Sequence, residues 1–399
     1  MSRIVPSRRS FLVGAGALMA SAAIGPAFGA SVSSFVDRTW ASARAQGVSR
    51  KTFDAAMGGF KPLQSVIKLT GAQPEFASTA ADYVTKRVSD ARASTGRSMR
   101  GEWQQTLAAV SQRYGVQPEI ILAIWGIETN FGGFMGGTNT VHALATLTHA
   151  GYRASFFGDE LIRSLQILEQ GHVRATNMVG SWAGAMGHPQ FMPSSFMRYA
   201  VDFKGDGHKD IWTSVPDALA STANYLKAHG WRAGETWGYE VKLPTGFDYN
   251  NVWNGTAATL REWSGIGVRR ANGKAFPREG DVASLYMPMG ANGPVFAILP
   301  NFGVIKRYNN SDSYALAVGH LADRILGSAG FVAGWPNDTA LLKSQRVELQ
   351  AQLARRGYPV GTPDGIIGPK TRAAVMDFQA RAGLVPDGYA SGNLLRALS

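Results

Sequence analysis

The spacing of apolar residues constrains the fold of this chain more than any other feature. From Ser33 to Trp231 they recur mostly every three or four residues, which is typical of amphipathic helices, and glycines mark the expected helix ends. The pattern then changes, because Trp237 to Pro244 alternates like a strand and Val295 to Leu299 is rich in β-favouring residues. We therefore expect a mainly α fold of the α+β class, with a small β-rich insertion at about residues 236–300.

Residues 341–399 predict a separate small helical bundle. Two Pro-Asp-Gly turns, at 363–365 and 386–388, each follow a helix that is expected to end at a glycine. This half-repeat predicts a compact module of three short helices. The stretch 327–340 contains three glycines and a Trp-Pro pair, which is a composition typical of a linker. On its pattern alone, the module could equally serve as a structural cap.

Length, charge and composition limit the class of protein. The chain has 399 residues, of which 45% are hydrophobic, so it can bury a sizeable core and form more than one domain. Its formal net charge of +12 favours an anionic partner. The basic residues are scattered and form no stripe, so we expect no nucleic acid partner, whereas an anionic cell-wall polymer or a membrane surface fits. The chain has no cysteine, which excludes disulfides, thiol catalysis and a lipoprotein acyl anchor.

The N-terminus has the pattern of an export signal. Ser7 to Leu12 is a twin-arginine pattern, an apolar run follows at Val13 to Ile24, and small residues after it offer a cleavage site behind Gly29 or Ala30. The alternative is a transmembrane anchor, but the apolar run of about a dozen residues is shorter than the roughly 20 that span a bilayer. We expect residues 1–30 to be a signal peptide, and the mature protein to be periplasmic, soluble or wall-associated, without a stable membrane anchor.

One predicted helix, Pro118 to Glu128, ends its apolar stripe with a carboxylate. Proline suits the first turn of a helix, where its missing N–H costs nothing, and Ile121, Ile124 and Glu128 then share one face. A carboxylate beside apolar side chains is costly to ionise, so its pKa should rise, as a general acid at neutral pH requires. Spacing alone favours a plainer alternative, in which the carboxylate reaches water or pairs with an arginine.

The amino-acid sequence of this predicted helix resembles a known motif. Residues 123–132, Ala-Ile-Trp-Gly-Ile-Glu-Thr-Asn-Phe-Gly, resemble the catalytic Glu motif of lytic murein transglycosylases, specifically the membrane-bound lytic transglycosylase B family. Three further blocks resemble motifs of that family and come in its order: residues 181–195, 223–231 and 307–314. The resemblance covers roughly residues 33–325. It implies a lysozyme-like catalytic domain, which we place at residues 31–326.

The resemblance implies a mechanism with one carboxylate. Glu128 would protonate the oxygen between N-acetylmuramic acid and N-acetylglucosamine in peptidoglycan. It would then take the proton of the sugar's 6-hydroxyl, which closes a 1,6-anhydro ring. The substrate's own acetamido group would stabilise the cationic centre, so that no water, second carboxylate or cofactor is required. The alternatives are a lysozyme-type muramidase, in which water attacks, and a non-catalytic wall-binding scaffold, against which Glu128 and its motif argue.

Residue-by-residue carry-over from the family predicts the groove that would hold the glycan. Its candidate lining residues are Ser181, Gln190, Tyr225, Tyr308, Asn309 and Tyr314. The serine and the glutamine would offer hydrogen bonds to Glu128 or to the acetamido group. The tyrosines would offer flat apolar faces for sugar rings, or would alternatively pack in the core with a bonded hydroxyl.

Two further segments resemble parts of known families. The loop from Asp202 to Asp210 resembles an EF-hand-like calcium loop, with Asp202, Asp206, His208 and Asp210 as candidate ligands. Lys204 at position 3 and a threonine at position 12 depart from that template, so calcium binding stays open. The stretches around 357–371 and 378–379 resemble the widespread helical peptidoglycan-binding module, which implies that the tail raises the local concentration of the enzyme at the polymer.

Overall fold

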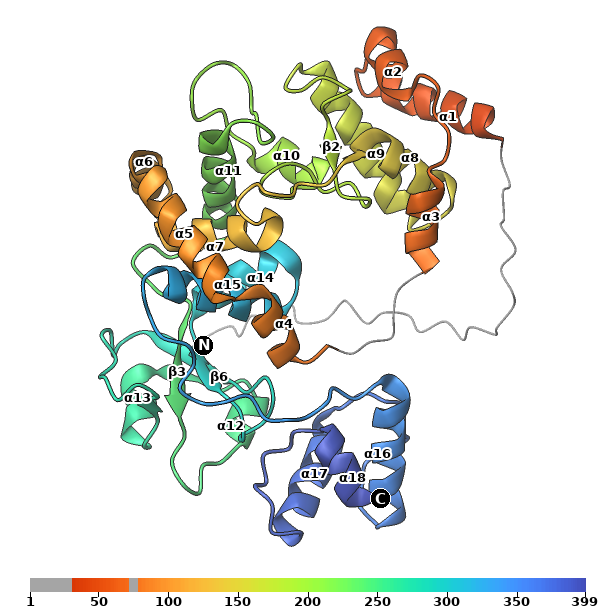
Figure 1. Cartoon of the computed structure of the whole chain (residues 1–399). Coiled ribbons are helices and arrows are strands. Elements are labelled where there is room, and N and C mark those ends of the chain that lie inside the picture. Colours follow the sequence, from red (N-terminus) through yellow and green to blue (C-terminus); the bar gives the residue numbers. More distant parts are fainter. Residues whose placement is uncertain (1–30, 72–77) are drawn as a thin grey trace, which may run out of the picture.

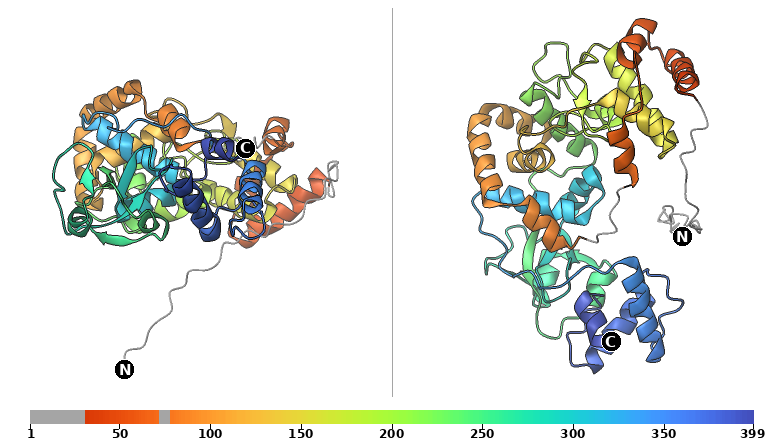
Figure 2. Two further views of the ribbon diagram at one scale, coloured as in Figure 1. Left: turned by 90° about the horizontal axis from the view of Figure 1, so that it is seen from below. Right: turned by 45° about the vertical axis from the view of Figure 1, so that its right-hand side comes forward.

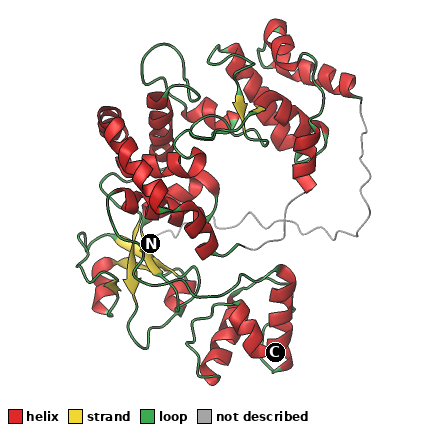
Figure 3. Cartoon of the chain, in the orientation of Figure 1, coloured by secondary structure: helices red, strands yellow, loops and turns green. Residues whose placement is uncertain are grey.

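The computed structural model describes residues 31–71 and 78–399, so the expected signal peptide lies outside the described residues. Helices form most of the described chain, and a small antiparallel sheet lies between the main helical body and a C-terminal bundle (Figures 1 and 3). This arrangement confirms the expected mainly α fold with a β-rich insertion and a helical C-terminal module. No helix in the described ranges is long and apolar enough to cross a membrane.

The helical body comes first in the chain and is completed after the sheet. Its helices are α1 (Val32–Ala45), α2 (Arg50–Met57), α3 (Gln64–Gly71), α4 (Ala80–Arg87), α5 (Asp90–Glu102), α6 (Gln104–Tyr114), α7 (Pro118–Thr129), α8 (Thr140–His149), α9 (Ala154–Glu169), α10 (Pro193–Tyr199), α11 (Val215–Ala228), α14 (Pro300–Asn309) and α15 (Asp312–Ile325). A short antiparallel ladder joins β1 (Thr138–Asn139) to β2 (Val179–Gly180). The body shares one large apolar core, to which most of these helices contribute.

Helix α7 runs through the core of this body. Residues Ile120 to Ile127 are all buried, and α7 packs against α5, α6, α11 and α15. Burying a large apolar side chain contributes about 1.5–3 kcal/mol, which offsets the chain entropy lost on ordering it. Pro118 occupies the first turn, as expected, and the helix ends where Asn130 and Phe131 adopt left-handed conformations with φ of 51° and 59°. The last turn of this buried helix carries Glu128.

The β-rich insertion is an antiparallel sheet with the strand order β4-β6-β7-β3-β5. Its elements are β3 (Gly238–Lys242), α12 (Asn250–Trp253), β4 (Ala257–Thr259), α13 (Leu260–Gly265), β5 (Arg269–Arg270), β6 (Val282–Tyr286) and β7 (Val295–Ile298). In the register, Tyr239 of β3 and Leu285 of β6 both lie opposite Ala297 of β7. Residues such as Trp263 and Leu260 form an apolar cluster separate from that of the helical body, so the insertion has a core of its own.

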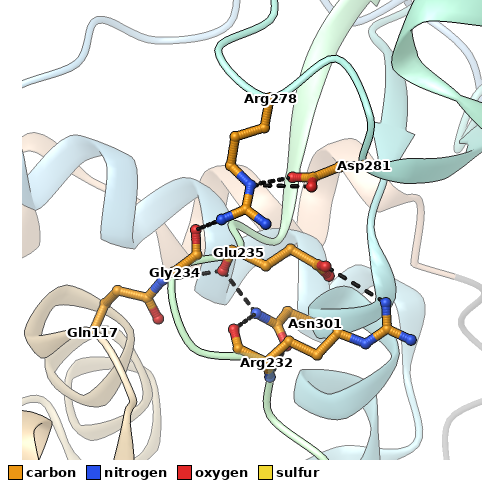
Figure 4. Close-up of polar contacts among 7 residues, drawn as sticks. All are labelled: Gln117, Arg232, Gly234, Glu235, Arg278, Asp281 and Asn301. Atoms are coloured by element: carbon orange, nitrogen blue, oxygen red, sulfur yellow. Dashed lines mark hydrogen bonds and ion pairs between the residues drawn. The ribbon is translucent and has the colours of Figure 1, made fainter.

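A hydrogen-bond network fastens the insertion to the start of α7 (Figure 4). The amide nitrogen of Asn301 donates to the carbonyls of Arg232 at 2.9 Å and of Glu235 at 2.7 Å. The Glu235 carbonyl also accepts Nε2 of Gln117, the residue before α7, at 3.0 Å. Arg278 of the insertion donates to the backbone of the same turn at 3.0 Å. These bonds fix the N-terminal end of α7 relative to the sheet.

The C-terminal bundle contains α16 (Lys343–Arg355), α17 (Pro369–Arg381) and α18 (Gly392–Leu398) around its own buried leucines and valines. Residues 326–342 before it form neither helix nor strand. They are nevertheless attached to the sheet, because Glu240 of β3 accepts the backbone N–H groups of Val332 and Ala333, both at 2.7 Å. In Figure 1 and in the right-hand view of Figure 2, the bundle lies beside the insertion, at the end of the molecule opposite α1 and α2.

Candidate active site

Glu128 lies at the end of α7, where the start of α15 packs against it. Tyr314, in the first turn of α15, donates its hydroxyl to Oε1 of Glu128 at 2.7 Å. The tyrosine is completely buried, with 0% of its surface exposed, whereas Glu128 is partly exposed. The carboxyl group is therefore oriented from within the core, in a residue that keeps some exposed surface.

Burial raises the pKa of Glu128 to about 7. The hydrogen bond from Tyr314 and the positive charge of Arg87 oppose this rise, because both favour the ionised form. Near neutral pH the carboxyl group is therefore divided between its protonated and ionised forms, which suits a group that gives a proton in one step and takes one in the next. Burial also raises the pKa of Tyr314 well above its usual value, so its hydroxyl remains a donor.

Three of the expected groove residues form a row of tyrosine rings that begins at Glu128. The centroids of Tyr314 and Tyr308 are 6.2 Å apart, and those of Tyr308 and Tyr225 are 4.8 Å apart. The hydroxyls of Tyr308 and Tyr225 donate to backbone carbonyls at 2.8 and 2.7 Å. Tyr314 and Tyr225 are buried and their hydroxyls are bonded, which matches the alternative of core packing. That these two rings contact sugars stays a prediction.

The end of α14 provides a more accessible side of the site. Tyr308 is partly exposed, and burial and the charge of Glu128 raise its pKa well above that of a free tyrosine. Asn309 is the last residue of α14 and is exposed. These two adjacent side chains therefore remain candidates for direct contact with a glycan.

The side chains of Ser181 and Gln190 form hydrogen bonds with the main chain and not with Glu128. Nε2 of Gln190 donates to the carbonyl of Met135, in the loop that follows α7, at 3.1 Å. The hydroxyl of Ser181 accepts two backbone N–H groups of its own turn, at 3.3 and 3.0 Å. In the structure the side-chain hydrogen bond to Glu128 comes from Tyr314. Hydrogen bonds from Ser181 and Gln190 to the substrate's acetamido group stay a prediction.

The first two motif blocks meet at the last turn of α7. Nε1 of Trp125 donates to Nδ1 of His188 at 3.0 Å, and Oγ1 of Thr129 donates to the His188 carbonyl at 3.2 Å. Gly132 has φ of +83°, and a Cβ there would lie 2.4 Å from the His188 ring. Only glycine fits this contact. The motif's Glu-Thr-Asn-Phe-Gly run is thus explained by packing as well as by chemistry.

Sequence reasoning missed two residues of α4. Nη1 of Arg87 donates to the carbonyl of Ile127 at 3.3 Å, and its guanidinium lies 5.4 Å from the centre of the Tyr83 ring. The charge of Arg87 lowers the pKa of Glu128, and the charge of Glu128 contributes to the raised pKa of Tyr83, which burial mainly causes. Their four-residue spacing, which puts both on one helix face, was the available signal. Nothing in the sequence indicates that this face meets the end of α7.

The loop at Asp202, for which calcium binding stayed open, does not bring its four candidate ligands together. No group of three or more acidic or histidine side chains in the described residues converges to hold a metal. The Asp202 carboxylate accepts backbone N–H groups at 2.6, 3.2 and 2.7 Å. Asp206 and Asp210 likewise accept N–H groups of their own turns, and His208 is exposed. The carboxylates therefore face N–H donors, and the charge of Lys204 contributes to the lowered pKa of Asp210, so these residues do not fit calcium.

Comparison with known proteins identifies the families of the two parts of the chain. The transglycosylase SLT domain family matches residues 31–323, and the peptidoglycan binding domain family matches residues 343–398. The chain is 35% identical over 295 residues to membrane-bound lytic murein transglycosylase B of Escherichia coli K12, which covers 70% of this chain and 79% of that protein. The solved structure of SltB3 from Pseudomonas aeruginosa in complex with NAG-anhNAM-pentapeptide is 44% identical, with a TM-score of 0.85 over 94% of this chain and 100% of that one. Slt35 of Escherichia coli in complex with calcium is 33% identical, with a TM-score of 0.61 over 74% of this chain and 92% of that one.

Proposed function

This chain belongs to the SLT transglycosylase family and is a lytic transglycosylase of peptidoglycan, and from that premise we propose that Glu128 cleaves the β-1,4 bond between N-acetylmuramic acid and N-acetylglucosamine with formation of a 1,6-anhydro end. The observation that carries this proposal is a lone carboxyl group with a pKa of about 7, held by Tyr314. Among the described residues, the neighbours that shift the pKa of Glu128 are Tyr314 and Arg87, and neither is a carboxylate.

In the first step, protonated Glu128 gives its proton to the oxygen that bridges the two sugars. The bond from this oxygen to C1 of the muramic acid breaks, and the N-acetylglucosamine side leaves with a new hydroxyl. The substrate's acetamido oxygen stabilises the positive charge at C1. The hydrogen bond from Tyr314 fixes one carboxyl oxygen, which leaves the other free to present the proton.

In the second step, Glu128 acts as a base. It is now ionised, and the Tyr314 hydroxyl and the charge of Arg87 stabilise that form. The carboxylate takes the proton of the muramic acid 6-hydroxyl, whose oxygen attacks C1 and closes the anhydro ring. Glu128 is then protonated again, and no water has been consumed. A two-carboxylate hydrolase would instead need a second acid roughly 5–9.5 Å away.

The relatives support the anhydro product. SltB3 was crystallised with NAG-anhNAM-pentapeptide, which contains the ring that this mechanism forms. The test is mass spectrometry of the sugars that the purified protein releases from peptidoglycan. We expect ends of 1,6-anhydro-N-acetylmuramic acid, lighter by one water than hydrolytic ends. Reducing N-acetylmuramic acid as the main product would instead identify a muramidase.

The C-terminal bundle is proposed to hold the enzyme on the wall. It has its own core and matches the peptidoglycan binding domain family over residues 343–398. Deletion of residues 341–399 should weaken sedimentation with insoluble peptidoglycan and spare cleavage of short soluble glycans. Unchanged sedimentation would leave the bundle a structural cap.

The protein is further proposed to reach the periplasm by the twin-arginine route and to act in wall remodelling or turnover. Ser31 caps α1 by accepting the N–H of Ser34 at 3.2 Å, and it directly follows the expected cleavage site. The first described helix therefore begins directly after the expected cleavage site. Replacing Arg8 and Arg9 with lysines should keep the protein out of the periplasmic fraction, and continued export of that variant would exclude this route.

A further inference from the structure

The two halves of the C-terminal bundle repeat one structural unit. In the first half, Oε1 of Gln350 accepts the N–H of Gly365 at 2.7 Å, and in the second, Oε1 of Gln379 accepts the N–H of Gly388 at 2.9 Å. Both glycines have a positive φ, +76° and +71°. In each turn the preceding aspartate accepts the N–H two residues ahead, at 2.8 and 2.9 Å. The repeat thus extends to individual hydrogen bonds.

The repeat also includes the helix face beneath each turn. Lys343 and Val347 precede Gln350 by the same numbers of residues as Arg372 and Met376 precede Gln379. A Cβ on the first glycine would meet Lys343 and Val347, at 2.9 and 3.2 Å, and one on the second would meet Met376 at 3.1 Å. The first turn therefore lies over Lys343 and Val347, and the second lies over Met376. We call the turns, with these helix residues, the first site (Asp364–Ile366) and the second site (Asp387–Tyr389).

The second site is occupied by the β-rich insertion. Nε1 of Trp253 donates to the Asp387 carbonyl at 2.6 Å, and the backbone N–H of Ala291 donates to Oδ2 of Asp387 at 2.8 Å. The guanidinium of Arg372 lies 4.0 Å from the centre of the Trp253 ring. This contact shows what such a turn binds: a ligand with two N–H donors and a flat face that covers the basic side chain.

The first site has the same groups and is open to solvent. Ile366 is 67% exposed, although it occupies the position that Tyr389 fills in the docked turn. The carboxylate of Asp364 lies in an exposed turn, where backbone and side-chain hydrogen bonds and the charge of Lys343 lower its pKa, so it is ionised at neutral pH. Ile366 therefore presents an exposed apolar side chain beside an ionised acceptor, in a turn that matches the docked one bond for bond.

We propose that the first site, with Lys343 and Val347, is the surface by which the bundle binds peptidoglycan, and that it recognises an amide-bearing segment of the polymer. The inference rests on the proposed wall-binding function of the bundle. Peptidoglycan supplies amide N–H donors beside flat sugar rings or peptide planes, which is the chemistry that Trp253 and the Ala291 N–H supply at the second site. The second site cannot do the same, because the insertion covers it.

The experiment measures retention of the full chain on insoluble peptidoglycan, in a Glu128→Gln background so that the polymer is not cut. Ile366→Ser and Asp364→Asn should each raise the apparent dissociation constant about tenfold, a loss of affinity typical of a central contact residue. Asp364→Asn keeps the oxygen that caps the turn and replaces the other, charged acceptor oxygen with an NH2 donor. The control is Leu384→Ser, since Leu384 is a comparably sized exposed residue, 45% exposed, outside both sites. Leu384→Ser should bind like the parent.

Two kinds of polymer separate the sources of the amide. If stem peptides supply the amide, their removal with an amidase should abolish the difference in retention between the parent and Ile366→Ser. If the acetamido groups of the sugars supply the amide, that difference in retention should persist. Normal retention of both first-site variants, together with weak retention of the chain that lacks residues 341–399, would overturn the inference and leave wall binding by the bundle intact. Normal retention even of that truncated chain would instead remove the proposed function of the bundle.

Discussion

The hydroxyl of Tyr314, buried in the first turn of α15, donates to Oε1 of Glu128 at the end of α7 across 2.7 Å. The pKa of Tyr314 is raised well above its usual value, chiefly by burial, so the hydroxyl keeps its proton while Glu128 loses and regains its own. The bond favours ionised Glu128 and thereby limits the rise in pKa that burial causes. Tyr314 is thus a positioning residue that balances the acid and base roles of one carboxyl group.

Replacing Tyr314 with phenylalanine should lower kcat and move its pH dependence. Cleavage begins from protonated Glu128, so activity should decline as the pH rises through its pKa of about 7. Without the hydroxyl that pKa rises further, so the alkaline limb should move to higher pH, while kcat at pH 7 falls roughly tenfold because the carboxyl group is less well oriented. Turnover of soluble glycans measured from pH 5 to about 9 tests both effects.

The matched control is Tyr308→Phe, because Tyr308 donates to a backbone carbonyl and not to Glu128. Its alkaline limb should stay where the parent's lies. A lower kcat for Tyr314→Phe with an unmoved limb would mean that Tyr314 acts only through packing.

Glu128→Gln should abolish turnover and stabilise the fold at alkaline pH. The amide cannot complete the proton cycle, which typically contributes about 10² to 10⁴-fold. Folding raises the pKa of Glu128 from 4.5 to about 7, so the folded parent loses stability as the pH rises through this window. Glutamine does not ionise, so the variant loses no stability in this way. The gain should be absent near pH 4 and reach up to about 3 kcal/mol above pH 8. Denaturant unfolding at both pH values measures it, and a folded variant with near-parental turnover would move catalysis elsewhere.

The sequence predicted the elements of the site better than their contacts. Pro118 at the start of α7 and an apolar stripe ending at Glu128 follow from local spacing, and the structure shows both. The resemblance to the family motif identified Tyr314 as a site residue, but it did not predict the hydrogen bond from the Tyr314 hydroxyl to Glu128. That bond depends on how α15 packs against α7, and no local pattern contains this information.

Arg87 and the Asp202 loop also show that the sequence does not reveal side-chain contacts. Arg87 acts on Glu128 only because α4 lies against the end of α7, which the sequence of α4 does not indicate. The Asp202 loop matches a ligand template in residue type, yet its carboxylates bind the backbone N–H groups of their own turn. The order of residue types does not reveal which way side chains point. Calcium binding by a loop that departs from the template at Lys204 and Thr213 therefore could not be decided from the sequence.

Asp323→Asn should stabilise the protein at neutral and alkaline pH without affecting catalysis. Burial raises the pKa of Asp323 to about 7, while Nε1 of Trp237 donates to its Oδ2 at 3.1 Å. Asparagine keeps an oxygen for that bond and cannot ionise. The gain in stability of Asp323→Asn over the parent should therefore be nil below pH 4 and grow as the pH rises to 7, because only the parent must bury a charge. Thermal melts across this range measure it, and a melting temperature lowered at every pH would show that the carboxylate itself is needed.

Calcium and chelators should leave the melting temperature of the protein unchanged. The Asp202 carboxylate already accepts three backbone N–H groups, and the charge of Lys204 acts on the same loop. Lys204→Asp removes that cation and adds an oxygen donor, so it should create calcium-dependent stabilisation. Ligand at about 100 times its dissociation constant contributes roughly 2.7 kcal/mol, enough to see in a melt. A calcium-dependent rise in the parent would show that the loop rearranges to bind the ion.

Trp253→Phe should loosen the contact between the C-terminal bundle and the β-rich insertion. Phenylalanine keeps a ring beneath Arg372 but loses the N–H that donates to the Asp387 carbonyl at 2.6 Å. A lost hydrogen bond of this kind costs about 1 kcal/mol, so local opening should become roughly fivefold more frequent. Hydrogen exchange should report this at the Ala291 N–H, which donates to Oδ2 of Asp387 across the same contact. The exposed Arg381 pairs with Asp377 of α17 and lies over the ring of Tyr358, both within the bundle, so Arg381→Ala should leave that exchange rate unchanged. Equal rates in the parent and Trp253→Phe would mean that the bundle is held by the segment at 326–342 and not by this contact.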